Sequence, residues 1–130
     1  MARILIADDE PEVRKALVRM VTEAGHQSME TSDGLGALYD TKELAPDVLL
    51  LDWMIPELTG GDVLHALRND PNYGSVSHTP VIIVSDFVEE SSRDTFLRAG
   101  ANAFVAKRDD LDGMKRELLS TIDCLITQTL

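Results

Sequence analysis

The stretch Val48-Leu49-Leu50-Leu51-Asp52 decides the fold, because four apolar residues in a row stop abruptly at a carboxylate. Three further runs of the same kind occur at 4–7, 81–84 and 103–106. Short unbroken apolar runs are typical of strands that are covered on both faces of a parallel sheet. A fifth run at 26–31 is more polar and fits an edge strand. The sequence therefore predicts a five-stranded parallel sheet buried between layers of helices.

Helical patterns separate these runs. The expected helices are one from Pro11 to Gly25, a second capped by Asp33, a third from about Gly61 to Asn69, a fourth ending at Gly100 and a fifth from about Asp109 towards Ile126. The stretch Pro71 to Pro80 is expected to be a polar loop. The fifth helix should carry an inward apolar stripe: Leu111, Met114, Leu118, Ile122 and Leu125. Strand and helix alternate, and right-handed crossovers then give an α/β, doubly wound sheet in a single domain over residues 1–130.

Polar residues follow the predicted strands directly or nearly so. They are Asp8, Asp9, Asp52, Ser85 and Lys107. The carboxyl ends of parallel strands meet along one edge, where a doubly wound sheet binds its ligand, so we expect these residues to converge. Three carboxylates, a hydroxyl and an ammonium group can hold a divalent cation and accept a phosphoryl group.

Carboxylates crowded in this way repel one another, which destabilises the fold unless a cation is bound. Magnesium suits a site with few carboxylates and room for water and a phosphate oxygen. Taken alone, Asp8 and Asp9 are better explained as a solvated turn at a helix N-terminus. Asp52 at the end of a neighbouring strand favours the metal site.

Asp52 is the candidate nucleophile, because it directly follows four residues of buried type. A carboxylate that attacks a phosphoryl group forms an acyl phosphate. Lys107 could place its charge on one phosphoryl oxygen, and Ser85 could donate a hydrogen bond to another. Alone, either residue is more often a surface lysine or a strand-end hydroxyl, so the inference depends on the ordered set.

The net charge of −11 argues against a surface that binds nucleic acid or anionic lipid. Cys124 is the only cysteine, which excludes an internal disulfide and is expected to pack on the last helix. The sequence has no apolar stretch of signal-peptide or membrane-spanning length. We therefore expect a cytoplasmic protein without a nucleic-acid or membrane partner.

Four segments, 4–10, 46–56, 79–85 and 99–107, resemble the receiver domain of two-component response regulators. The resemblance covers the whole chain and implies a flavodoxin-like sheet of strand order 2-1-3-4-5 with five helices. It implies that Asp52 takes a phosphoryl group from a histidine kinase or phosphotransfer protein, with Ser85 and Lys107 contacting that group. The implied Mg²⁺ ligands are Asp8, Asp9, Asp52 and the backbone carbonyl of Met54.

The resemblance also implies a switch. In this family the hydroxyl, here Ser85, moves towards the phosphate, and an aromatic residue, here Phe104, follows it. Simple core packing explains Phe104 equally well. The output surface would be helix 4, strand 5 and helix 5, acting on a downstream protein effector. The chain would be a monomer or a phosphorylation-dependent dimer, and would catalyse only its own phosphoryl transfer and autodephosphorylation.

The chain departs from the family pattern at several positions. Asp86 stands where a small residue is usual, and could either repel a donor or cap the fourth helix with Glu89. Arg108 replaces a frequent proline, which puts a cis peptide bond there in doubt. Met54 and Phe87 are bulky, and we hypothesise that they shield an acyl phosphate from water.

Three other functions fit less well. A pseudo-receiver that signals without phosphate would not need the complete acceptor set. A magnesium-dependent phosphatase with an aspartyl nucleophile would usually carry a second acid where this chain has Met54. A flavin-binding module would need a phosphate-binding loop after the first strand, where Asp8, Asp9 and Glu10 would repel a phosphate.

Overall fold

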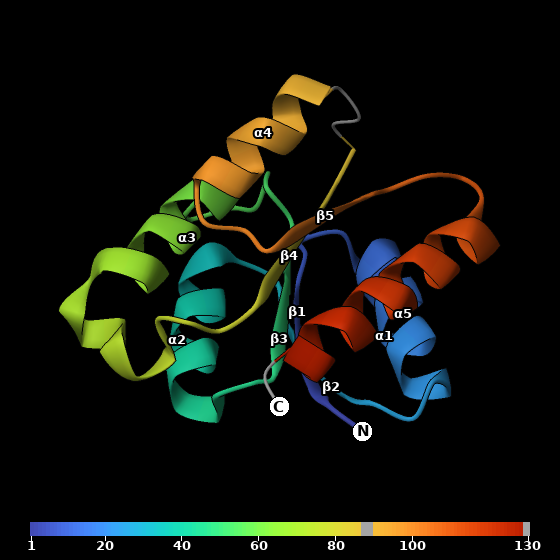
Figure 1. Cartoon of the computed structure of the whole chain (residues 1–130), viewed down its shortest axis with the longest axis horizontal. Coiled ribbons are helices and arrows are strands. Elements are labelled where there is room, and N and C mark those ends of the chain that lie inside the picture. Colours follow the sequence, from blue (N-terminus) through green and yellow to red (C-terminus); the bar gives the residue numbers. More distant parts are fainter. Residues whose placement is uncertain (87–89, 129–130) are drawn as a thin grey trace.

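The computed structural model describes residues 1–86 and 90–128, with the backbone alone for 90, 91 and 128. Strands and helices alternate along the chain, as Figure 1 shows. In chain order the elements are β1 (Arg3–Ala7), α1 (Pro11–Glu23), β2 (Gln27–Thr31), α2 (Gly34–Leu44), β3 (Val48–Leu51), α3 (Gly60–Asn69), the 3₁₀ helix η1 (Pro71–Val76), β4 (Val81–Ser85), α4 (Glu90–Arg98), β5 (Ala103–Ala106) and α5 (Leu111–Gln128).

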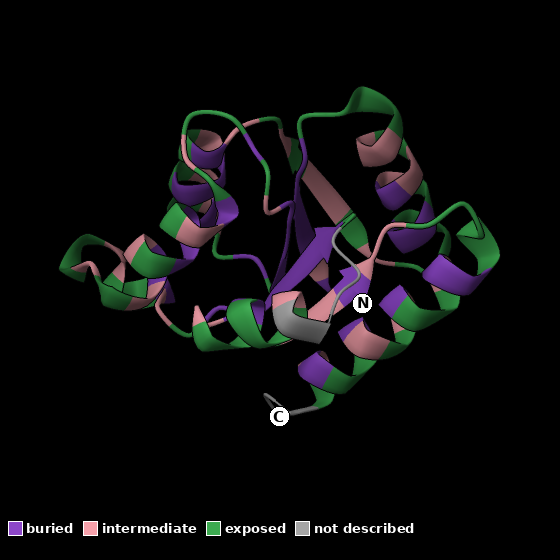
Figure 2. Cartoon of the chain, turned by 90° about the horizontal axis from the view of Figure 1, so that it is seen from above, coloured by how far each residue is buried: buried purple, intermediate pink, exposed green. Residues whose placement is uncertain are grey.

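The described strands form one parallel sheet of order β2-β1-β3-β4-β5, which confirms the predicted fold class and strand order. Helices α1 and α5 cover one face, and α2 and α3 cover the other (Figure 1). The buried residues concentrate on the central strands and on the helix sides that face them (Figure 2). Such double coverage explains why these strands read as continuous apolar runs.

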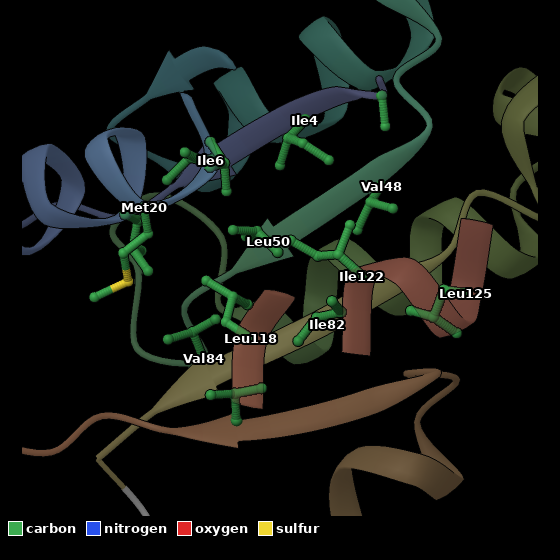
Figure 3. Packing of buried hydrophobic residues seen from close by; sticks show 14 of the residues in the cluster. Ile4, Ile6, Met20, Val48, Leu50, Ile82, Val84, Leu118, Ile122 and Leu125 are labelled. Atoms are coloured by element: carbon green, nitrogen blue, oxygen red, sulfur yellow. The ribbon is translucent and has the colours of Figure 1, made fainter. Parts of the chain in front are cut away.

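Successive residues of each strand point to opposite faces, which divides the core in two. On the α1–α5 face, aliphatic side chains of β1, β3 and β4 pack against α5, as Figure 3 shows. This layer includes Ile6, Leu50 and Ile82 with Leu118 and Ile122. The alternate residues, such as Leu5, Leu49 and Ile83, belong to the second cluster. Burial on both faces fixes the register of the central strands.

Local signals account for most helix starts. Pro11 begins α1 as predicted, and the Asp33 side chain caps α2 by accepting a hydrogen bond from the Gly36 backbone N–H. Helix α3 begins one residue earlier than predicted, because Thr59 and Asp62 form a reciprocal capping box. The predicted Asp86–Glu89 cap of α4 falls partly outside the described residues, and Phe87 lies outside them altogether.

Four details of the sequence-based prediction were wrong. The Pro71–Pro80 stretch contains η1, which Asp70 caps at the Asn72 backbone N–H. His26 lies outside β2, and its Nδ1 accepts a hydrogen bond from the Ala2 backbone N–H at 3.0 Å. Leu111 is 54% exposed, because α5 begins at this residue on the rim of the domain. Cys124 is exposed on α5.

Candidate functional site

Sheet order brings the predicted site residues to the carboxyl ends of adjacent strands. β1 and β3 pair in register, and the Asp52 backbone N–H donates to the Ala7 carbonyl at 3.0 Å. Asp8 and Asp52 therefore follow neighbouring strands. On the other side, the Lys107 backbone N–H donates to the Ser85 carbonyl at 2.8 Å. The order 2-1-3-4-5 thus gathers residues that are up to a hundred positions apart.

Asp8 and Asp9 lie in the turn from β1 into α1 but differ in burial. Asp8 is 1% exposed, and its Oδ1 accepts a hydrogen bond from the Glu10 backbone N–H at 2.9 Å. Asp9 is exposed. One carboxylate is thus held inside the domain, and the next faces the solvent from which a cation would arrive.

Lys107 is the cation at the centre of the site. Its Nζ lies 2.9 Å from Asp8 Oδ2, 3.2 Å from Asp52 Oδ2 and 3.6 Å from Glu10 Oε1. The side chains of Lys107, Asp8 and Asp52 are largely buried, so solvent screens these two ion pairs little, whereas Glu10 is exposed. One ammonium group therefore bridges the two buried carboxylates on which the predicted chemistry depends.

The pKa values of Asp52 and Lys107 reflect the excess of carboxylates over cations in the site. Burial raises the pKa of Asp52, Lys107 lowers it, and the nearby Asp8 charge raises it again, so that the pKa remains above its ordinary value. Burial lowers the pKa of Lys107, but hydrogen bonding and charge from Asp8 and then Asp52 outweigh burial and raise that pKa. The site holds more negative charge than its lysine neutralises.

The surplus carboxylates are arranged so that they could hold a metal ion. One oxygen each from Asp8, Asp9, Glu10 and Asp52 lies within 4.8 Å of the others. Asp8 Oδ2 is buried, and the ammonium that faces it at 2.9 Å, Lys107 Nζ, is shared with Asp52 and Glu10. Hard carboxylate oxygens with an unmet demand for positive charge fit Mg²⁺. The sequence had not indicated Glu10 as a member of this cluster.

Met54 follows the candidate nucleophile in the loop after β3. Its backbone N–H donates to Asp52 Oδ1 at 3.2 Å, and its residue exposure is 62%. The structure thus ties the Met54 main chain to Asp52. The predicted roles of the Met54 carbonyl in binding metal and of its side chain in shielding remain predictions.

The loop after Asp52 packs tightly against the start of α3. A Cβ atom added at Gly60 would lie 2.8 Å from the Trp53 Cα and 3.0 Å from the Asp52 carbonyl oxygen. Further along the loop, Gly34 donates its backbone N–H to the Pro56 carbonyl at 2.9 Å, and a Cβ atom added at Gly34 would overlap the Leu58 carbonyl oxygen. Glycine at both positions lets helix termini approach the loop that carries Asp52 and Trp53.

The two predicted switch residues lie on adjacent strands. Ser85 is 1% exposed at the end of β4, and Phe104 is partly buried on β5. The Phe104 ring centroid lies 5.1 Å from that of Phe96 on α4, which in turn lies 4.6 Å from that of Trp53. Sequence analysis missed this chain of rings, although a single tryptophan directly after Asp52 was a visible signal. The peptide bond before Arg108 is trans.

Comparison with known proteins agrees with this geometry. The family model for the response regulator receiver domain matches residues 4–119. The chain is 35% identical over 122 residues to the transcriptional regulatory protein KdpE of Mycobacterium tuberculosis, covering 94% of this chain and 51% of KdpE. It is 32% identical over 126 residues to protein PilH of Pseudomonas aeruginosa, covering 97% of this chain and 98% of PilH. The chain thus spans about half the length of KdpE and nearly all of PilH.

Solved structures show the same fold. The receiver domain of the Francisella response regulator 1452 superposes with a TM-score of 0.86 at 27% identity, covering 100% of both chains. The receiver domain of the sensor histidine kinase PA1611 from Pseudomonas aeruginosa superposes with a TM-score of 0.82 at 23% identity, covering 97% of this chain and 98% of that one. Among the described helices, none has the length and apolarity that crossing a membrane requires. The chain belongs to the receiver domains of two-component response regulators.

Proposed function

We propose that Asp52 accepts a phosphoryl group from the phosphohistidine of a histidine kinase or phosphotransfer protein. The observation that carries this proposal is the position of the Asp52 carboxylate. It is 5% exposed, lies 3.2 Å from Lys107 Nζ and belongs to a cluster of four carboxylates within 4.8 Å. A buried carboxylate of this kind, with a cation on one oxygen, is suited to attack phosphorus and to hold the resulting acyl phosphate.

In the proposed reaction, a carboxylate oxygen of Asp52 bonds to phosphorus while the bond from phosphorus to the donor histidine nitrogen breaks. The product is an aspartyl phosphate and a histidine that has regained its lone pair. Lys107 helps keep Asp52 ionised, because its charge opposes the effect of burial on the Asp52 pKa. As Asp8 also holds Lys107 Nζ at 2.9 Å, the ammonium can turn from Asp52 to a phosphoryl oxygen without leaving the site.

Mg²⁺ would be held by Asp8, Asp9, Asp52 and the Met54 carbonyl, and would supply neutralising charge for the phosphoryl oxygens. The carboxylate cluster supports this assignment. The PA1611 receiver domain is described with a magnesium ion coordinated in its active-site cleft. The chemistry of this chain would be confined to its own phosphoryl transfer and autodephosphorylation.

Phosphorylation would then change the surface formed by α4, β5 and α5, and so regulate a downstream protein effector. The Ser85 hydroxyl would move towards the phosphoryl group, and Phe104 would follow it. Contact of Phe104 with Phe96 on α4 supports this link. We place the protein in the cytoplasm, as a monomer or a phosphorylation-dependent dimer, without a nucleic-acid or membrane partner.

The test is chemical modification with acetyl phosphate or beryllium fluoride in the presence of magnesium. We expect one modified residue, Asp52, and no modification of Asp52→Ala. Asp112→Ala is a matched control, because Asp112 is an exposed acid in the first turn of α5. Failure of the wild-type chain to react would contradict the proposal and favour a pseudo-receiver. Equal labelling of Asp52→Ala would also contradict it, by assigning the phosphoryl group to another residue.

A further inference from the structure

Arg14 on α1 contacts the main chain of the acid cluster, which is formed by Asp8, Asp9, Glu10 and Asp52. Its Nη1 donates a hydrogen bond to the Asp8 carbonyl oxygen at 2.8 Å, and its Nε donates to Glu30 Oε1 at 3.1 Å. The Arg14 backbone N–H also donates to the Glu10 carbonyl at 2.9 Å. The backbone bond is the ordinary bond of the first helical turn, so the contact to this turn that is specific to arginine is the one with the Asp8 carbonyl.

The Asp8 carbonyl belongs to the peptide unit that joins Asp8 to Asp9. Holding this oxygen restrains the plane of that peptide, and therefore the position of the Asp9 Cα that carries the carboxylate. On the opposite side, Asp8 Oδ1 holds the Glu10 backbone N–H. The Asp8 side chain cannot restrain its own carbonyl group in this way. Arg14 can, because its side chain reaches that carbonyl from α1.

Such a constraint matters because the carboxylates repel one another. Their oxygens lie within 4.8 Å, and Lys107 supplies only one positive charge. Without the hydrogen bond from Arg14 to the Asp8 carbonyl, repulsion would move the exposed Asp9 and Glu10 carboxylates apart, and the geometry that an incoming cation needs would be lost. The Glu30 end of the contact is exposed, so the ion pair orients the guanidinium more than it stabilises the fold.

We propose that Arg14 is a positioning residue for the magnesium site, acting through the main chain of Asp8. The inference rests on the proposed function, since it assumes that the acid cluster binds Mg²⁺. Groups that orient metal ligands without touching the metal typically contribute tenfold or more to affinity. We expect Arg14→Gln to weaken Mg²⁺ binding about tenfold.

The control variants separate the effect of the Arg14 contacts on Mg²⁺ affinity from the effect of its positive charge. Arg19→Gln removes the same charge from an exposed position on the same helix, so we expect it to leave Mg²⁺ affinity within about twofold of wild type. Arg14→Lys keeps the charge but replaces the planar guanidinium, whose Nη1 and Nε point at two different acceptors, by a single ammonium without that fixed geometry. If Arg14 acts by position, Arg14→Lys also weakens binding. Glu30→Ala, which frees one side of the guanidinium, should have an intermediate effect.

The experiment is calorimetric titration of each variant of the 130-residue chain with MgCl₂, below its metal-free melting temperature. Affinity for Arg14→Gln within twofold of that for Arg19→Gln would overturn the inference, as would wild-type affinity for Arg14→Lys. Should Arg14→Gln fail to fold, Glu30→Ala decides, and unchanged affinity in that variant counts against the proposal.

A second readout does not need metal. In the metal-free protein, the amide resonances of Asp9 and Glu10 should shift in Arg14→Gln and stay in place in Arg19→Gln. Unshifted amides in Arg14→Gln would also overturn the inference. Absence of Mg²⁺ binding by the wild-type chain would instead count against the proposed function, and the amide resonances would still report whether Arg14 holds the turn.

Discussion

The two faces of the sheet are built from different kinds of side chain. The cluster under α1 and α5 consists of aliphatic and methionine residues, including Leu50, Met114 and Leu118. The cluster under α2 and α3 carries rings among its described residues: Trp53, Tyr73, Phe96 and Phe104. Flexible aliphatic groups fill the first face, whereas flat rings with fixed contacts line part of the second.

The aromatic face connects the site to the rest of the domain. Trp53 directly follows Asp52, and its ring contacts Phe96 of α4, which contacts Phe104 of β5. Phe96 is 2% exposed, whereas 93–95, 97 and 98 of the same helix are exposed. Among the α4 side chains that the structure describes, 92–98, Phe96 is the buried one, so the face that lies next to Asp52 includes a helix that exposes most of its described side chains.

The largest expected effect is that of Phe96→Ala, which should lower the free energy of unfolding by about 3–5 kcal/mol. The reason is the loss of a buried ring that contacts two other rings. Urea unfolding measures the loss. Hydrogen exchange should also show faster exchange of the described α4 backbone.

Leu118→Ala on the aliphatic face is the matched control. Because Leu118 is fully buried, we expect a comparable loss of about 2–5 kcal/mol but no selective loosening of α4. Equal protection of α4 in the two variants would break the distinction between the faces.

Sequence reasoning located the strands and most of the site, because both depend on local order. Val48–Leu51 stops at Asp52 whatever the rest of the chain does, and strand order then determines that Asp8 lies beside it. The aromatic chain escaped prediction, because the contact of Trp53 with Phe96 depends on how α4 crosses the sheet. Arg14 escaped for a similar reason, since helical periodicity does not reveal which carbonyl a side chain reaches. Both are tertiary contacts without a spacing rule.

Gly60→Ala should cost about 1–3 kcal/mol, because the added methyl group would be forced against the main chain of Trp53 and Asp52. Gly74→Ala, in η1, is the control: its Cβ would meet nothing within 4 Å, so stability should change by less than about 0.5 kcal/mol. Thermal unfolding of both variants checks the difference. Equal stability would show that the loop after Asp52 relaxes, and that the aromatic face is less rigid than its contacts indicate.

Asp52→Asn removes the negative charge of the buried carboxylate that follows β3, and so tests what that charge costs the folded protein. As the folded-state pKa of Asp52 is raised, the folded protein binds this proton more tightly than the unfolded chain. The free energy of unfolding therefore falls as pH rises from about 3.8 through the raised pKa, and asparagine removes this loss. In chelator, Asp52→Asn should melt a few degrees above wild type at pH 7, and the gap should shrink towards pH 4. A gap independent of pH would contradict the assignment.

The smallest expected effect concerns the aliphatic face, where Arg108 and Glu117 form an exposed ion pair at 2.8 Å. Exposed pairs lose in side-chain entropy and solvent screening most of what they gain in attraction, so Arg108→Ala should cost about 0.5 kcal/mol or less. A double-mutant cycle with Glu117→Ala isolates the pair from any packing of the arginine stem. A coupling energy well above about 1 kcal/mol would mean that surface charge holds α5 in place. A value near zero would assign the attachment of α5 to its buried stripe, in contrast to α4, where Phe96 is the buried side chain among the described residues 92–98.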